Sequence, residues 1–131
     1  MNTIWIILLI ILGFLLTMRF VIIPYYSRRP TNLGIRDKKF APCPTTDNCV
    51  CTLEGEQIHQ IDPIVYTGAI ELAKKKIKHA IHAYGRAKIV TETSDYLYTE
   101  FRSLLWGFVD DVEFYFDDFN KVIHFRSASR V

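Results

Sequence analysis

The feature that most constrains the fold is a strict alternation of apolar and polar residues near the C-terminus. Val112, Phe114 and Phe116 alternate with polar residues, and the same pattern returns at residues 123–126. A strand turns successive side chains to opposite faces, so each segment predicts a β-strand with one buried face. The Asp- and Asn-containing break between the segments is typical of a turn. The two segments are therefore expected to form a β-hairpin.

The residues before the hairpin predict one helix and two further strands. Apolar residues recur at helical spacing from Ala69 to Tyr84, and Gly85 follows them as a C-cap. Residues 88–93 are rich in β-branched side chains, and residues 96–104 alternate between apolar and polar. We therefore predict an α+β domain in which one amphipathic helix packs on the apolar face of a four-stranded antiparallel meander.

The N-terminal residues predict a helix that crosses a membrane once. Residues 4–23 are apolar except for Gly13, Thr17 and Arg19, and about 20 apolar residues cross a bilayer. Arg19 lies within one turn of the end of this stretch, from which its side chain can reach the headgroups. The alternative is a cleaved signal peptide. Such peptides begin with basic residues and end in a small-residue cleavage site, and neither feature is found here.

The chain thus divides into a transmembrane anchor at residues 1–23, a basic linker at residues 24–42, and a small α+β domain at residues 43–131 that begins with a cysteine-containing loop. The linker is rich in Pro, Gly and charged residues, without periodicity. Basic residues follow the apolar stretch and none precedes it, so the positive-inside rule places the domain in the cytoplasm. The bilayer is the expected partner. The linker's basic residues are expected either to attract anionic headgroups or only to be solvated.

Cys43, Cys49 and Cys51 lie within nine residues of one another. Zinc and iron–sulfur sites usually have four ligands, often in paired Cys-x2-Cys elements, so we predict neither a metal nor another cofactor. Two alternatives stay open. A Cys43–Cys49 disulfide would require an oxidising compartment, whereas three reduced thiols would fit the cytoplasm. The odd cysteine count and the basic flank favour the cytoplasm.

Polar strand residues are expected to gather on the sheet face that the helix leaves uncovered. Cross-strand neighbours lie about 5 Å apart, so we expect Glu113 to contact Arg102 and either Arg126 or His124. The candidate ligand-binding residues are Arg102, Asp110, Asp111, Glu113, His124, Arg126, Ser127 and Arg130.

This polar face suggests two functional hypotheses. The first is a non-enzymatic domain that binds a small ligand or a partner protein. The second is an enzyme for an anionic or lipid-derived substrate near the membrane, with Glu113 or His124 as general base and Arg126 and Arg102 holding the substrate. The structural alternative is a solvated face with weak ion pairs.

Several function classes are disfavoured by the sequence. A nucleophile elbow, a zinc-protease helix, a phosphate-binding glycine loop and a dinucleotide fingerprint are all missing, so catalytic residues stay unassigned. The formal net charge of +2 is not gathered into a nucleic-acid-binding module, and nucleic acid is not an expected partner.

The same residues carry a family resemblance. The run at residues 110–114, followed by that at residues 126–130, resembles the signature of the domain-of-unknown-function 1499 family. Upstream, Cys43-Pro44 and residues 48–50 resemble the family's first motif. Cys51 stands where the family usually has a small hydroxyl residue, and the family pattern continues beyond these motifs with a Gly-initiated segment. The resemblance implies an uncharacterised membrane-anchored domain, and it implies no mechanism. A further hypothesis is that this chain is a family member that has lost part of its site.

Overall fold

The N-terminal residues form one long helix. The computed structural model describes residues 2–53 and 55–131. The helix begins as α1 (Thr3–Thr17), widens into the π-helical turn η1 (Met18–Ile22) and ends as α2 (Ile23–Tyr26). The π turn ends two residues before Pro24, which has no amide hydrogen to donate to the preceding turn. Within the described residues, this 24-residue helix is the one that is long and apolar enough to span a membrane.

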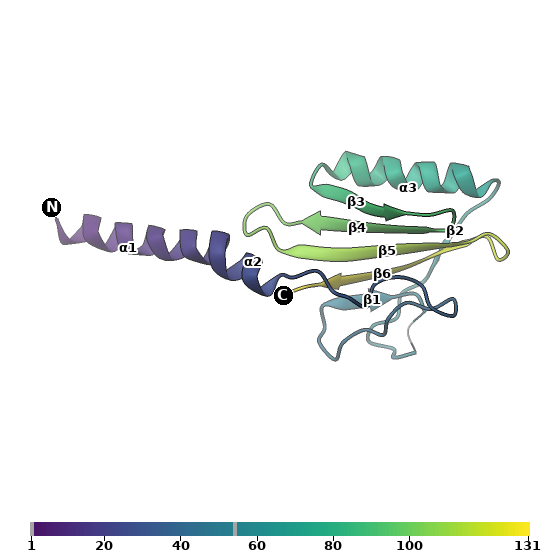
Figure 1. Ribbon diagram of the computed structural model, residues 1–131, viewed down its shortest axis with the longest axis horizontal. Coiled ribbons are helices and arrows are strands. Elements are labelled where there is room, and N and C mark those ends of the chain that lie inside the picture. Colours follow the sequence, from purple (N-terminus) through teal and green to yellow (C-terminus); the bar gives the residue numbers. More distant parts are fainter. Residues whose placement is uncertain (1, 54) are drawn as a thin grey trace.

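The rest of the chain forms an antiparallel sheet with the strand order β1-β6-β5-β4-β3, and β2 also pairs with β6 (Figure 1). The predicted meander of β3 to β6 is confirmed. The two additional strands escaped prediction because they contain only three and two residues. Their extended conformation depends on pairing with β6, which local sequence does not reveal. The strands are β1 (Cys49–Cys51), β2 (Ile64–Val65), β3 (Ala87–Glu92), β4 (Tyr96–Arg102), β5 (Val109–Asp117) and β6 (Val122–Ser129).

The predicted amphipathic helix is α3 (Ile70–Tyr84), and it packs on the apolar face of the sheet. Gly85 ends it with a left-handed backbone at φ 80°, a conformation that glycine adopts without strain. The helix and the sheet share one apolar core. Its buried members are Ala73, Ile81, Leu97, Phe116 and Ile123.

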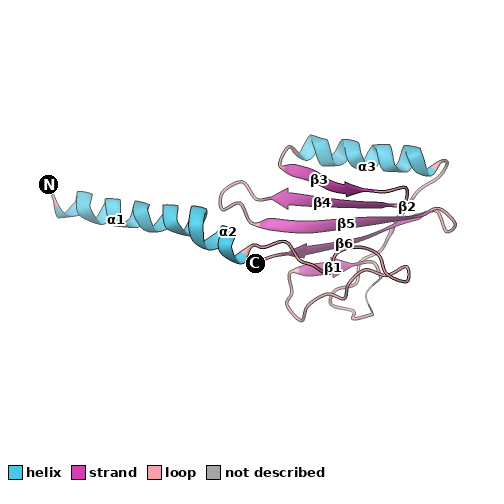
Figure 2. Cartoon of the chain, viewed as in Figure 1, coloured by secondary structure: helices cyan, strands magenta, loops and turns pink. Residues whose placement is uncertain are grey.

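The opposite face of the sheet is covered by the linker. After α2, the chain runs as an irregular trace past β6 and β1 (Figure 2). Gly34 hydrogen-bonds Glu113 of β5, and Phe40 is buried. The sheet is therefore enclosed on both faces, and the interpretation of its polar face as a solvated surface is wrong. A linker without periodicity gives no sign that it will fold back, so sequence reasoning left this face open.

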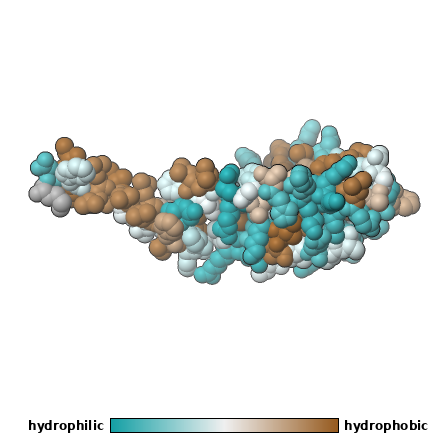
Figure 3. Space-filling view, turned by 90° about the horizontal axis from the view of Figure 1, so that it is seen from above, coloured by the Kyte–Doolittle hydropathy of each residue, from teal (hydrophilic) through white to brown (hydrophobic). Residues whose placement is uncertain are grey.

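Surface character separates the N-terminal helix from the domain. Figure 3 shows the helix as a mostly brown, hydrophobic projection, beside a domain whose visible face is largely teal. The side chains of α1 are exposed along its length. An isolated apolar helix of this kind is typical of a segment whose surroundings are lipid.

Candidate functional site: a buried charge network with an open cavity

Half of the eight predicted polar residues do meet, but they meet in the interior. Glu113 is 0% exposed, Asp111 1% and Arg126 5%. The register places Arg126 opposite Glu113, as expected, and Asp111 opposite Glu100. We call the following set the linker-side charge network: Arg29, Glu100, Asp111, Glu113, Arg126 and Arg130.

Arg130 is the most fully bonded member of the network. Its Nε and Nη2 donate to the two carboxylate oxygens of Asp111 at 2.8 and 2.6 Å. Nη2 also donates to Glu100 Oε1 at 2.6 Å, and Nη1 donates to the carbonyl of Ser27 at 3.1 Å. The hydrogen bonds that Arg130 donates to Asp111 raise the pKa of Arg130, although burial opposes this. With every nitrogen engaged, Arg130 is a structural cation.

Glu100 is held between two guanidinium groups. Arg29 of the linker donates to its Oε1 at 2.8 Å, beside the bond from Arg130. Burial opposes ionisation of Glu100, but the hydrogen bonds and charges of these two arginines outweigh it and lower its pKa to about 2. The phenol of Tyr98 donates to Asp111 at 2.6 Å, and burial followed by this bond raises the pKa of Tyr98. Glu100 is therefore ionised, and Tyr98 is neutral, at physiological pH.

Glu113 is positioned by the linker and by β4. Its Oε1 accepts hydrogen bonds from the Gly34 amide at 2.6 Å and from the Tyr96 phenol at 2.7 Å. Its Oε2 faces Arg126 at 3.5 Å. Burial, followed by the bond to Glu113, raises the pKa of Tyr96, so the phenol keeps its proton and remains a donor.

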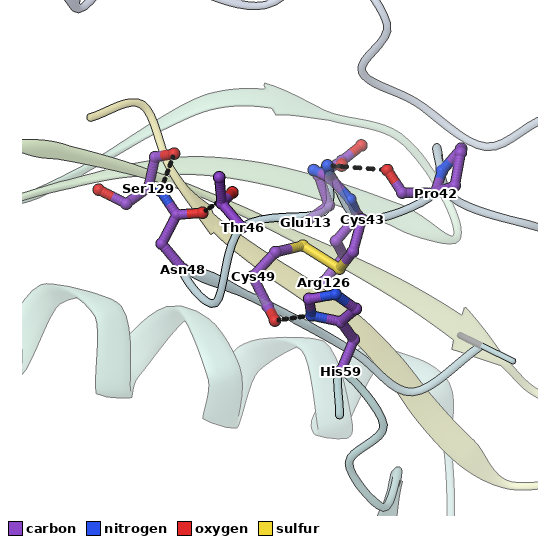
Figure 4. Close-up of a disulfide and its surroundings, with 9 residues drawn as sticks. All are labelled: Pro42, Cys43, Thr46, Asn48, Cys49, His59, Glu113, Arg126 and Ser129. Carbon is purple, nitrogen blue, oxygen red and sulfur yellow. Dashed lines mark hydrogen bonds and ion pairs between the residues drawn. A yellow bond between two sulfur atoms is a disulfide. The ribbon is translucent and has the colours of Figure 1, made fainter. Parts of the chain in front are cut away.

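Arg126 differs from Arg130 because it is buried but weakly bonded. Nη1 lies 3.5 Å from Glu113, and Nη2 lies 3.5 Å from the carbonyl oxygen of Pro42. Its Nε is buried and has no hydrogen-bond partner among the described residues. Buried donors are normally satisfied, so this nitrogen needs a further acceptor. Figure 4 shows Arg126 beside the Cys43–Cys49 disulfide, with the dashed line to Pro42.

A cavity of about 460 Å³ opens at Arg126 between the linker and β6. Its charged lining is Arg28, Asp111, Arg126 and Arg130, and its walls include Pro42, Cys43 and Ser129. Both carboxylate oxygens of Asp111 are already bonded to Arg130. The cavity therefore presents an excess of positive charge to whatever enters it.

The cysteine-containing loop forms one wall of this cavity. Cys43 and Cys49 are joined in a disulfide with a Cα–Cα separation of 5.7 Å, one of the two alternatives that the sequence left open. Cys51 is buried and lies outside the disulfide. His59 fixes the loop through a 2.9 Å hydrogen bond between its Nδ1 and the Cys49 carbonyl (Figure 4). The bridge holds Cys43 close to Arg126.

Four of the eight predicted site residues belong neither to the lining of this cavity nor to the linker-side charge network. The register places Val109, not Glu113, opposite Arg102, so the expected Arg102–Glu113 contact is absent and Arg102 pairs with Glu100 at 3.7 Å. Likewise His124 lies opposite Tyr115, not Glu113.

His124 instead shares a 3.1 Å hydrogen bond with Thr52, and burial lowers the pKa of its imidazole. Asp110 and Ser127 alternate with Asp111 and Arg126 along their strands, which turns them to the other face of the sheet.

Sequence reasoning missed the contribution of the linker, and it did not include Glu100 and Tyr98 among the candidate ligand-binding residues. The alternation of β4 puts Glu100 and Tyr98 on the same face as the predicted residues, and this signal was present in the sequence. Arg29, Gly34 and the Ser27 carbonyl gave no such signal, because they contact the sheet through long-range packing of an aperiodic segment. In residues 2–53 and 55–131, no three His, Cys, Asp or Glu side chains are grouped to hold a metal ion.

Comparison with known proteins assigns a family but not a reaction. The sequence model of the family described as "Protein of unknown function (DUF1499)" matches residues 39–131. The chain belongs to this family. The match includes the disulfide loop, all the strands, α3 and the C-terminal arginines. It leaves out the N-terminal helix and most of the linker. No curated protein and no solved structure matches the chain significantly.

Proposed function

We propose that this protein is a membrane-anchored binding domain that holds a small anionic ligand in the cavity at Arg126. The observation that carries this proposal is the buried Nε of Arg126, which has no hydrogen-bond partner among the described residues. Its other two nitrogens make contacts at 3.5 Å, the long limit of a hydrogen bond. A carboxylate or phosphate-like group would satisfy this guanidinium with short, charge-assisted bonds.

The cavity has the size and charge for such a ligand. Small-molecule sites usually enclose about 300–1,000 Å³, and the volume of about 460 Å³ lies within that range. Arg28 adds a second cation at the cavity, while Arg130 and Asp111 neutralise each other. These features favour an anion over a neutral or cationic ligand.

The N-terminal helix supports the anchor, and the disulfide bears on the side of the membrane. The basic residues after the helix predict a cytoplasmic domain, whereas disulfides persist in oxidising compartments. We favour the oxidising side, because the Cys43–Cys49 bridge forms a wall of the proposed site. Trapping free thiols in intact cells with an alkylating reagent tests this choice. Labelling of Cys51 alone after unfolding supports it, and labelling of all three cysteines contradicts it.

An enzyme acting on an anionic or lipid-derived substrate is the alternative, with Glu113 as its base. Glu113 is fully buried and its Oε1 already accepts two hydrogen bonds, so it is poorly placed to accept a proton from a substrate. His124 is bonded to Thr52 and does not line the cavity. The geometry therefore favours binding over catalysis.

The test of the binding function is a titration of the full-length chain in neutral detergent with inorganic phosphate and with succinate. We expect saturable binding by the native chain. In the double variant Arg126→Gln/Glu113→Gln, which removes the cation without leaving a buried carboxylate unpaired, affinity should fall at least about tenfold, or about 1.4 kcal/mol. The matched control is Arg36→Gln, an exposed linker arginine. Equal affinity in a folded double variant, or no binding of either anion by the native chain, would refute the site.

A further inference from the structure

We propose that the loop between β4 and β5, residues 103–108, enters the bilayer beside the N-terminal helix and that the basic cavity next to it binds the phosphate of an anionic lipid headgroup. This inference rests on the membrane anchor proposed above. It concerns a different cavity from the one at Arg126.

The loop packs directly against the end of the helix. An apolar cavity of about 290 Å³ lies between them, lined by Met18, Ile22 and Ile23 of the helix and by Trp106 and Phe108 of the loop. Arg19 lies so close to Gly107 that a Cβ added there would come within 2.8 Å of the guanidinium. Gly107 also has a φ of 69°, so glycine serves both the turn and the close approach.

The level of this contact along the helix places the loop in the membrane. The 24-residue helix is about 36 Å long at about 1.5 Å per residue, and the hydrocarbon core is about 30 Å thick. Only about four residues of an upright helix therefore extend beyond the hydrocarbon. Even if all four lie at the C-terminal end, the boundary falls near Ile22. Gly107 of the loop lies against Arg19, and Trp106 shares a cavity with Met18 and Ile22, so the loop lies at or below that boundary.

The loop exposes side chains that favour such a location. Leu104 is 77% exposed and Leu105 is 75% exposed, and Trp106 follows them. Water would surround these adjacent leucines in a free domain, whereas the acyl chains would cover them in a bilayer. Tryptophan is favoured at the membrane–water interface. The loop thus combines an apolar tip with an interfacial anchor.

The adjacent cavity, of about 320 Å³, supplies the charge for a headgroup. Its basic lining residues are Arg19, Arg86, Lys88 and Arg102, and Leu104 of the loop also lines it. Glu100 is its one carboxylate among the described residues, and Glu100 is already bonded to Arg130 and Arg29. The guanidinium of Arg19 has no acidic partner in the described part of the chain; it lies against Gly107 and over the ring of Phe20, 5.3 Å from the ring centre. A cation at this depth requires a counter-charge.

A lipid phosphate fits this cavity better than a soluble anion does. The cations and the exposed leucines belong to one continuous region, with Leu104 and Arg19 in the same lining. A phospholipid carries a phosphate and acyl chains in one molecule, so a single lipid can contact both the cations and the leucines. Basic residues near an anionic leaflet are attracted to it even without a formed cavity.

The experiment measures the depth of Trp106 in vesicles. The full-length chain carries Trp5→Phe, which leaves Trp106 as its one tryptophan. It is reconstituted in phosphatidylcholine vesicles that contain either brominated phosphatidylcholine or brominated phosphatidylglycerol, with bromine on the upper acyl chain. We expect Trp106 to be quenched by both lipids, and more strongly by phosphatidylglycerol. A chain that sediments with the vesicles while Trp106 stays unquenched would overturn the inference and leave the anchor standing.

Two pairs of variants separate the loop from the charges. Leu104→Asp/Leu105→Asp should abolish quenching without releasing the chain from the vesicles. Its control is Phe119→Asp, at an equally exposed turn at the opposite end of β5. Arg86→Gln/Arg102→Gln should reduce the preference for phosphatidylglycerol by roughly tenfold while quenching by phosphatidylcholine persists. Its control is Lys75→Gln/Lys76→Gln on the exposed side of α3. Equal behaviour of a variant and its control would contradict the corresponding role.

Two further outcomes distinguish the sources of the anion and the failure of the anchor. Inorganic phosphate in the buffer should not displace brominated phosphatidylglycerol. Displacement would assign the cavity to a soluble anion and overturn the lipid assignment. A chain that does not sediment with vesicles at all would refute the anchor, and this inference with it. The anion site at Arg126 is tested separately in detergent and does not depend on this result.

Discussion

The two faces of the sheet are both buried, but by opposite means. On the α3 face, apolar side chains such as Leu97, Phe116 and Ile81 pack together. On the linker face, charged side chains such as Glu113 and Arg130 are enclosed by a segment without regular structure. Apolar burial stabilises without directional requirements. Buried ions instead offset their desolvation only when each partner is present and correctly placed. The linker face should therefore tolerate fewer substitutions than the α3 face, and its stability should depend on pH.

Breaking the linker-side network at its centre should have the largest effect. Arg130→Met leaves Asp111 and Glu100 buried without their shared cation, which should reduce the free energy of unfolding by about 3–5 kcal/mol. Chemical denaturation of the chain in detergent measures this loss. The triple variant that also carries Asp111→Asn and Glu100→Gln should recover part of it. A loss of under 1 kcal/mol for Arg130→Met would mean that the network is solvated.

Truncation on the α3 face should cost a comparable or slightly smaller amount. Phe116 is 2% exposed and lies in the shared core, so Phe116→Ala should cost about 3–5 kcal/mol by opening a cavity. Phe114 is only partly buried, and Phe114→Ala should cost less. The same denaturation experiment ranks the two variants. The reverse order would show that the strand register differs from the one described.

Acidification should have the next largest effect on stability, and it should act on the linker face of the sheet. The pKa of Glu100 is lowered to about 2 from its ordinary value of 4.5, so its stabilising contribution is present above pH 4.5 and is lost as the pH falls toward 2. This loss is on the order of 3 kcal/mol at most. Unfolding free energies between pH 6 and pH 2 should fall less steeply in Glu100→Gln. The matched control, Glu92→Gln at an exposed pair with Lys78, should change the pH dependence less, because an exposed ion pair contributes little to stability.

Reduction of the disulfide should have the smallest effect and a local one. The bridge closes a loop with a sequence separation of 6, for which loop-closure entropy gives a stabilisation of about 2 kcal/mol. In Cys43→Ser/Cys49→Ser, hydrogen exchange should accelerate at the linker and β1 and stay unchanged at α3. Equal acceleration on both faces would mean that the two faces unfold as one unit.

The contrast between the faces also explains what the sequence could predict. Periodicity fixed the meander, α3 and the burial of Phe116, because these depend on local alternation and helical spacing. It also predicted that Glu113 would lie beside Arg126 or His124, and the register places Arg126 there. It could not predict that Gly34 and Arg29 would close the polar face, because those contacts join residues 79 and 71 positions apart through a segment without a pattern.

The direct bond between Ser27 and Arg130 has a mechanical consequence. Ser27 is the residue that follows α2, and its carbonyl oxygen accepts a hydrogen bond from Arg130, which follows β6. A hydrogen bond thus joins the end of the N-terminal helix directly to the end of the last strand. For a chain anchored as proposed, this hydrogen bond restrains the domain from swinging outward or rotating, and it favours one height and one orientation of the anion cavity above the lipid. Its encounters then occur by lateral diffusion in two dimensions, with molecules that reach the membrane surface.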